Sequence, residues 1–204
     1  MTSAFHCCAI VLAALPASAL AQTADTGTAT GTNIGTDTGT ATGNVAISGR
    51  VAPVCILGAP SQTTIDLGQL AASSGSRAGR IATLAQQSVT LPGSFCNFAG
   101  STLTVTASAL VSADATTPPG SFARVINYTA TASNWAPINA STTTSATASG
   151  ASQSSSGTGT TQPTPKLADV GVALSAFAVP GDAMLISGTY SGSVTITLGP
   201  ALTQ

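Results

Sequence analysis

Few residues in this chain could do chemistry, and their types exclude most kinds of active site. The only histidine, His6, and two of the four cysteines, Cys7 and Cys8, lie within the first 21 residues, and the chain has no glutamate. Without those 21 residues, no histidine remains for a Ser-His-Asp triad, for a Cys nucleophile, or for a His/Cys metal site. We therefore expect a protein that is not an enzyme, has no cofactor or metal, and acts through its surface and its assembly.

Scattered carboxylates and one tryptophan are the remaining candidates for catalysis or binding. The domain that follows residue 43 contains four aspartates: Asp66, Asp114, Asp169 and Asp182. Two carboxylates at a set separation could support glycoside hydrolysis, but turn-forming and capping roles are commoner for single aspartates. Trp135, with Tyr128 nearby, could form a sugar-stacking platform, although a Trp that anchors a core or loop is the commoner case. Asn127 and Asn139 match the acceptor pattern for N-linked glycans.

The first 21 residues have the features of a secretory signal. An apolar run covers residues 9–15, Pro16 ends it, and Ala19-Leu20-Ala21 has the small residues of a cleavage site. The run is too short for a membrane span. We expect export to the periplasm, the cell surface or the exterior. In such an oxidising compartment Cys55 and Cys96 most simply pair with each other, and two buried free thiols are the alternative.

The low charge of the chain limits its partners. Charged residues are 5% of the sequence and the net charge is −1, whereas about 25% is usual for soluble domains. No basic stripe could neutralise phosphates, so we expect no binding to nucleic acid. A chain with so little charge has little protection against association. This composition suits a protein that packs into an assembly or onto a surface.

Two stretches have low complexity. Residues 22–43 repeat the motif Asp-Thr-Gly-Thr-Ala-Thr-Gly and hold one large apolar residue, Ile34. Such a stretch cannot bury enough surface to offset the entropy of ordering, so we predict a flexible arm. Residues 140–165, rich in Ser, Thr and Gly, are predicted to be a disordered insertion in one domain that spans 44–204.

Elsewhere the apolar residues recur with a period of two, which indicates strands. The clearest case is Tyr190–Leu198, in which Val194, Ile196 and Leu198 alternate with Ser and Thr. Similar patterns cover residues 45–51, 65–67, 88–91, 103–109, 124–129 and 170–176. Roughly seven short strands separated by Gly, Pro, Asn and Ser are typical of an antiparallel β-sandwich.

The order of the motifs resembles that of exported bacterial pilus subunits of the chaperone–usher type, and of the related spore coat protein U family. An early cysteine in Val51–Cys55 precedes an apolar-x-Leu-Gly segment at Ile65–Gly68, and the second cysteine is followed by Asn97. Near the C-terminus, a Gly-x-Tyr turn at Gly188–Tyr190 leads into the last alternating stretch. The resemblance implies that Cys55 and Cys96 join the first two strands of an immunoglobulin-like, pilin-like sandwich.

In the resembled families the sandwich lacks its last strand, and a chaperone or neighbouring subunit supplies one by β-augmentation. The resemblance therefore implies an incomplete sheet edge, a periplasmic chaperone and an outer-membrane usher as partners, and association with like or related subunits. The expected assembly groove has Val194, Ile196 and Leu198 on one side, and Val45, Ile47 and Val51 on the other. We expect a structural subunit of a cell-surface coat or fimbria-like assembly; the alternative is a secreted adhesin or carbohydrate-binding module that acts as a discrete domain.

Overall fold

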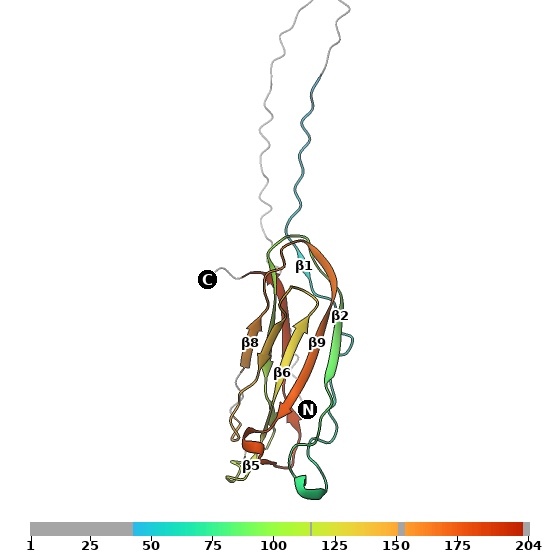
Figure 1. Ribbon diagram of the computed structural model, residues 1–204. Helices are drawn as coiled ribbons and strands as arrows, with labels where there is room; N and C mark the ends of the chain where they lie inside the picture. Colours follow the sequence, from blue (N-terminus) through green and yellow to red (C-terminus); the bar gives the residue numbers. More distant parts are fainter. Residues whose placement is uncertain (1–42, 115, 151–153, 202–204) are drawn as a thin grey trace, which may run out of the picture. The chain divides into compact units, whose positions relative to one another are not determined.

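The computed structural model describes residues 43–114, 116–150 and 154–201. The chain divides into two units between Ser48 and Gly49. The described residues of the first unit, 43–48, form no strand or helix and have exposed side chains. The second unit holds the strands described below (Figure 1). The expected signal and Thr-rich arm, residues 1–42, lie outside the described residues.

The second unit is built from strands, which confirms the all-β class. The strands are β1 (Cys55–Ile56), β2 (Gln87–Cys96), β3 (Ser101–Ser108), β4 (Leu110–Ser112), β5 (Phe122–Ala123), β6 (Val125–Ser133), β7 (Ala140–Thr143), β8 (Ser154–Thr158), β9 (Lys166–Ala178), β10 (Met184–Leu185), β11 (Tyr190–Ser191) and β12 (Val194–Pro200). Two short 3-10 turns, η1 (Gly75–Arg77) and η2 (Pro180–Asp182), are the helical elements of the described chain. None of its helices is long and apolar enough to cross a membrane.

Alternating side chains explain why these segments form half-buried strands. Along β3, Leu103, Val105 and Ala107 are buried and the Thr residues between them are partly exposed. Successive side chains of a strand point to opposite faces, so one face packs on the core and the other meets solvent. The strand β12 alternates in the same way. The period of two therefore correctly indicates β3 and β12. The predicted strand 190–198 is broken at Gly192, however, with Tyr190–Ser191 in the larger sheet, and the stretches 45–51 and 65–67 form no strand.

The strands form a curled, mainly antiparallel arrangement. The larger sheet has the order β1-β2-β9-β6-β4-β11, with β7 also on β6, and a smaller sheet has the order β12-β3-β8. Two connections pass from one sheet to the other, since β3 is followed directly by β4 and β11 directly by β12. Gly192 lies at the second crossing, where a Cβ would come within 2.9 Å of the Ala109 and Ser108 carbonyl oxygens. Close backbone contact thus holds the two crossings together.

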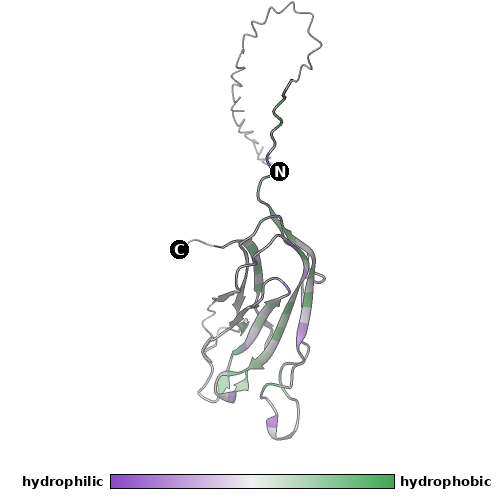
Figure 2. Ribbon diagram, turned by 45° about the horizontal axis from the view of Figure 1, so that its top comes forward, coloured by the Kyte–Doolittle hydropathy of each residue, from purple (hydrophilic) through white to green (hydrophobic). Residues whose placement is uncertain are grey.

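The main core lies between the two sheets. Leu103 and Val105 of the smaller sheet pack with Val170 and Val172 of the larger one, and Trp135 completes the cluster. A second buried cluster, around Ile126 and Leu185, fills the end of the domain near the short parallel pair β5–β10. Strongly hydrophilic residues are few on the described strands (Figure 2), in keeping with the low charge of the sequence.

The segment 140–165 differs from the disordered insertion expected from its composition. It contains β7, which pairs with β6, and β8, which pairs with β3. Residues 151–153 lie outside the described residues. Cross-strand hydroxyl pairs support the described part, such as Thr106 with Ser156 at 2.7 Å. Small polar side chains can line an edge strand without large apolar groups, so composition alone does not indicate such a strand.

Candidate assembly groove

The two sheets meet closely along one side of the domain. A Cβ at Gly157 of β8 would overlap the backbone carbonyl of Ser141 in β7, and one at Gly159 would lie 2.7 Å from the Ile138 oxygen. The Ile138 amide donates to Thr160 Oγ1 at 3.1 Å, and the Thr160 amide donates to the Ile138 oxygen at 3.3 Å. Glycine is therefore required for the backbones to approach, and this seam of the domain is closed.

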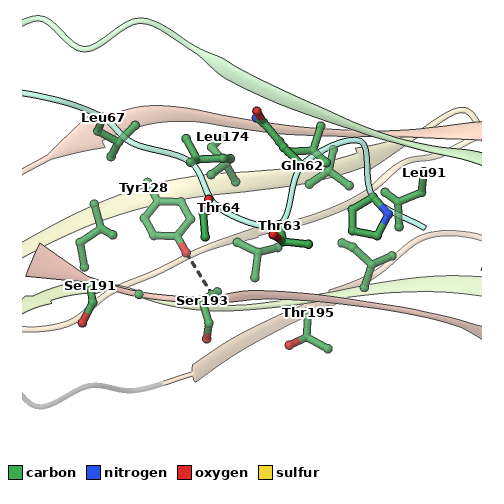
Figure 3. Close-up of a pocket in the computed structure, with 18 of the residues that line it drawn as sticks. Gln62, Thr63, Thr64, Leu67, Leu91, Tyr128, Leu174, Ser191, Ser193 and Thr195 are labelled. Atoms are coloured by element: carbon green, nitrogen blue, oxygen red, sulfur yellow. Dashed lines mark hydrogen bonds between the residues drawn. The ribbon is translucent and has the colours of Figure 1, made fainter. Parts of the chain in front are cut away.

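On the opposite side, an apolar groove of about 690 Å³ separates β12 from the β2 side of the larger sheet (Figure 3). Val194 and Ile196 of β12 line it from one sheet, and Val89, Leu91 and Leu174 line it from the other. The floor includes Tyr128, whose ring lies between the two walls in the close-up. Apolar pockets with a few polar groups are the usual form of a binding site.

The strand β12 forms one open edge of this groove. All seven of its residues pair antiparallel with β3, from Val194 opposite Ala107 to Pro200 opposite Ser101. No strand among the described residues pairs with its other edge. Such an edge presents unpaired N–H and C=O groups and is a template for pairing with another segment. The open edge and the apolar groove therefore lie side by side.

The structure changes the expected composition of the groove. Val194 and Ile196 line it as expected, whereas Leu198 lines a neighbouring pocket of about 490 Å³ with Cys55 and Phe98. Val51 does not line either pocket and is exposed.

Two other residues expected in that wall, Val45 and Ile47, belong to the first unit, where their side chains are exposed. The opposite wall is built instead from Leu57, Ile65 and Leu67, together with the β2 and β9 side chains. The sequence misled here because an alternating pattern shows which side chains share a face but not which partner that face contacts.

The segment Leu57–Leu67 lies across the groove and is called the covering segment below (Figure 3). It forms no strand. Its Ser61 amide donates to the Thr90 oxygen at 2.8 Å, and the Thr90 amide donates to Ser61 Oγ at 3.1 Å. Gln62 and Thr64 line the groove while remaining exposed to solvent. The groove is thus partly covered by a segment held through few backbone bonds.

A disulfide fixes the start of the covering segment. Cys55 and Cys96 are bonded, and their Cα atoms lie 4.2 Å apart as partners in the β1–β2 pair. The expected disulfide is confirmed, and the alternative of two free thiols is wrong. Asn97 adds a side-chain clamp, since its Oδ1 accepts from the Val54 amide at 2.8 Å and its Nδ2 donates to the Ala52 oxygen at 2.9 Å. Residues 52–54 are therefore held beside Asn97.

Tyr128 ties the two sheet crossings together at the groove floor. Its hydroxyl donates toward the Ser108 oxygen at 2.8 Å and the Ser193 oxygen at 3.2 Å. Burial raises the pKa of Tyr128 to about 12. The neutral phenol is thus the form that holds β12 beside β3. Sequence reasoning noted Tyr128 only as a neighbour of Trp135, and no local signal distinguished this role.

The other residues considered for catalysis, sugar binding or glycan attachment do not form a shared site. Trp135 is buried and its Nε1 donates to Ser101 Oγ at 3.2 Å, so it is a core residue. The carboxylates of Asp66 and Asp114 accept backbone N–H groups in loops, from Gly68 and Thr116. That of Asp169 in β9 accepts the Gly93 amide at the register shift of β2. Asn127 bonds to Ala146, and Asn139 is exposed.

Asp182 is the exposed partner of two arginines. Its Oδ1 lies 2.8 Å from Arg77 and its Oδ2 3.0 Å from Arg80. The hydrogen bond from Arg77 and the charges of both arginines lower the pKa of Asp182. Across the described parts of the chain, no three His, Cys, Asp or Glu side chains gather as metal ligands would.

Comparison with known proteins gives no further guide to the site. No family model, curated protein or solved structure matches this chain significantly.

Proposed function

We propose that the protein is an exported, non-enzymatic subunit of a cell-surface coat or fimbria-like assembly, and that it associates by β-strand addition. One observation carries this proposal: the seam at β7–β8 is closed by glycines, whereas the seam at β12 combines an open edge with an apolar groove. An added strand would satisfy the backbone of β12 and bury the groove walls at the same time. The domain is then an immunoglobulin-like sandwich that lacks one strand.

The segment 43–51 has the features of a strand to be donated. Val45, Ile47 and Val51 alternate along it, and Ile47 is 94% exposed. Exposure of large apolar side chains to water is unfavourable in free energy. Insertion of the segment into an apolar groove would remove this unfavourable exposure. Gly49 fits a point where a backbone approaches closely. We propose that this segment of one copy enters the groove of another.

A chaperone and an usher remain the proposed partners before assembly. The resemblance to chaperone–usher subunits supports them, and so does the hazard of an open edge in a protein with little charge. The alternative is a secreted adhesin or carbohydrate-binding module that acts as a discrete domain, for which Trp135 is the candidate sugar-stacking residue. Because Trp135 is buried, we do not favour that alternative.

A synthetic peptide of residues 43–54 tests the proposal. Labelled peptide should bind the mature protein and shift its oligomers toward capped monomers. A peptide with the same composition, in which Ile47 exchanges places with Ser48, should bind far more weakly because the Ile then lies on the opposite face from Val45 and Val51. If both peptides fail to bind, and the mature protein stays monomeric at high concentration, strand addition is not its mode of association.

A further inference from the structure

We propose that an apolar patch on the outer face of the larger sheet, formed by Ile56, Phe95 and Leu167, is a second contact between successive copies of this chain. The inference rests on the proposed strand addition and names a surface outside the groove. The patch of one copy would contact the second copy, whose groove has accepted the strand donated by the first.

The patch is a cross-strand row of three apolar side chains. Ile56 of β1 is directly opposite Phe95 of β2, which is directly opposite Leu167 of β9. Directly opposite residues in a sheet share a face, with Cβ atoms about 5 Å apart. Ile56 is 55% exposed and Leu167 is 72% exposed. The adjacent residues on the same three strands form a second row whose side chains point to the opposite, core side: Cys55, Cys96 and Lys166.

The patch contrasts with the outer face of the smaller sheet. There, Thr104 and Thr106 of β3 pair through their hydroxyls with Thr158 and Ser156 of β8. Thr195 of β12 is exposed and stands opposite Thr106. A strand face meets water at little cost when it carries hydroxyls. A row of Ile, Phe and Leu at the same kind of position marks a surface that is covered in the assembled state.

The length of the connecting chain indicates what covers the patch. The donated segment ends at Val51 and β1 begins at Cys55, so three residues join the two. Three extended residues span at most about 10 Å. Asn97 holds Ala52 and Val54 against the domain, which shortens this reach. The accepting copy must therefore lie against the end of the donor from which the chain leaves.

Ile56 lies two residues beyond Val54, so the patch begins where this contact must form. Three side chains are too few for a stable interface by themselves, because specific interfaces bury about 1,600 Å². We expect the patch to strengthen strand addition and not to replace it. Isolated domains without residues 43–51 should not associate through the patch alone.

The test separates the patch from the groove. Leu167→Thr and Ile56→Thr remove apolar surface with β-branched residues that suit strands. Ile138→Thr is the matched control, since Ile138 is 64% exposed and belongs to neither the patch nor the groove. For each variant of the mature protein, the Tm, the Kd for the 43–54 peptide and the assembly constant by sedimentation velocity are measured.

Both patch variants should leave the Tm and the peptide Kd unchanged and weaken assembly by roughly tenfold. The Ile138 variant should assemble like the wild type. Equal assembly of the patch variants and the wild type would overturn the inference while leaving strand addition intact. If wild-type protein binds no peptide yet assembles through the patch, strand addition is wrong and the patch is a contact of another kind. If it neither binds peptide nor assembles, both proposals fail.

Discussion

The pair of substitutions Ile196→Asp and Thr195→Asp tests the orientation of β12 most directly. Ile196 lines the groove and is partly buried against the core, whereas Thr195, one residue earlier, is exposed on the outer face. Adjacent residues of a strand point to opposite faces, so the same carboxylate enters the groove in one variant and water in the other. The two variants therefore share a net charge and place the new carboxylate on opposite faces of the strand.

The expected magnitudes follow from this placement. Losing half-buried Ile surface costs about 1 kcal/mol, and placing a carboxylate against apolar walls adds about 1–3 kcal/mol. Ile196→Asp should thus lower the free energy of unfolding by about 2–4 kcal/mol, a large part of the stability of a small domain. Thr195→Asp should cost less than about 1 kcal/mol, as is usual for surface changes.

Urea unfolding of the monomer and the oligomer size of the mature protein are the measurements. We expect Ile196→Asp to abolish the larger oligomers, because an inserted strand would bury the carboxylate fully. Thr195→Asp should keep them. Equal midpoints and equal oligomer sizes for the two variants would refute the assignment of Ile196 to the groove wall.

Three further predictions concern the residues that hold the groove in shape. Reduction of the Cys55–Cys96 disulfide, which closes a separation of 41 residues, should lower stability by up to about 4 kcal/mol in urea unfolding with and without reductant; an unchanged midpoint would mean that the bond adds nothing. Tyr128→Phe removes the hydroxyl that contacts the Ser108 and Ser193 oxygens and should cost about 1 kcal/mol in thermal unfolding, because a partly buried hydrogen bond is lost; a wild-type Tm would contradict this role. The pKa of Tyr128 is raised from 10.0 to about 12 in the folded state. The neutral phenol therefore stabilises the folded state, and ionisation of the phenol at high pH removes this stabilisation. That stability should be complete below pH 10 and lost as the pH rises through 12, and a Tyr128→Phe variant with the same alkaline profile would refute the link.

The sequence was sufficient for the parts of the fold that depend on alternation. The period of two placed β3 and β12, and with them Val194 and Ile196 on the groove side. The cysteine count, together with the expectation of export, predicted the Cys55–Cys96 bond that the structure contains. These inferences succeeded because each depends on local pattern or on the chemistry of one residue type.

The parts that were missed depend on contacts between distant backbones. The strand β8 has no large apolar side chain; it pairs with β3, and Gly157 lets its backbone meet that of Ser141. The covering segment contributes Leu57, Ile65 and Leu67 to the groove without strand pairing, so alternation could not indicate it. Composition reports average polarity, whereas these positions are decided by which backbone lies opposite.

The proposed strand addition accounts for the absence of charged residues on the edge strand β12. A sandwich closed on both sides could carry charges on all its edges, and charged edges are a common protection against pairing. Here β12 offers Thr195, Thr197 and Gly199 where lysine would block an incoming strand. An edge strand that pairs with a partner strand must lack charged side chains. Because it lacks them, it can also pair with the wrong strands. If strand addition is correct, we therefore expect the chain to depend on a capping protein until its groove is filled, and to aggregate when produced alone.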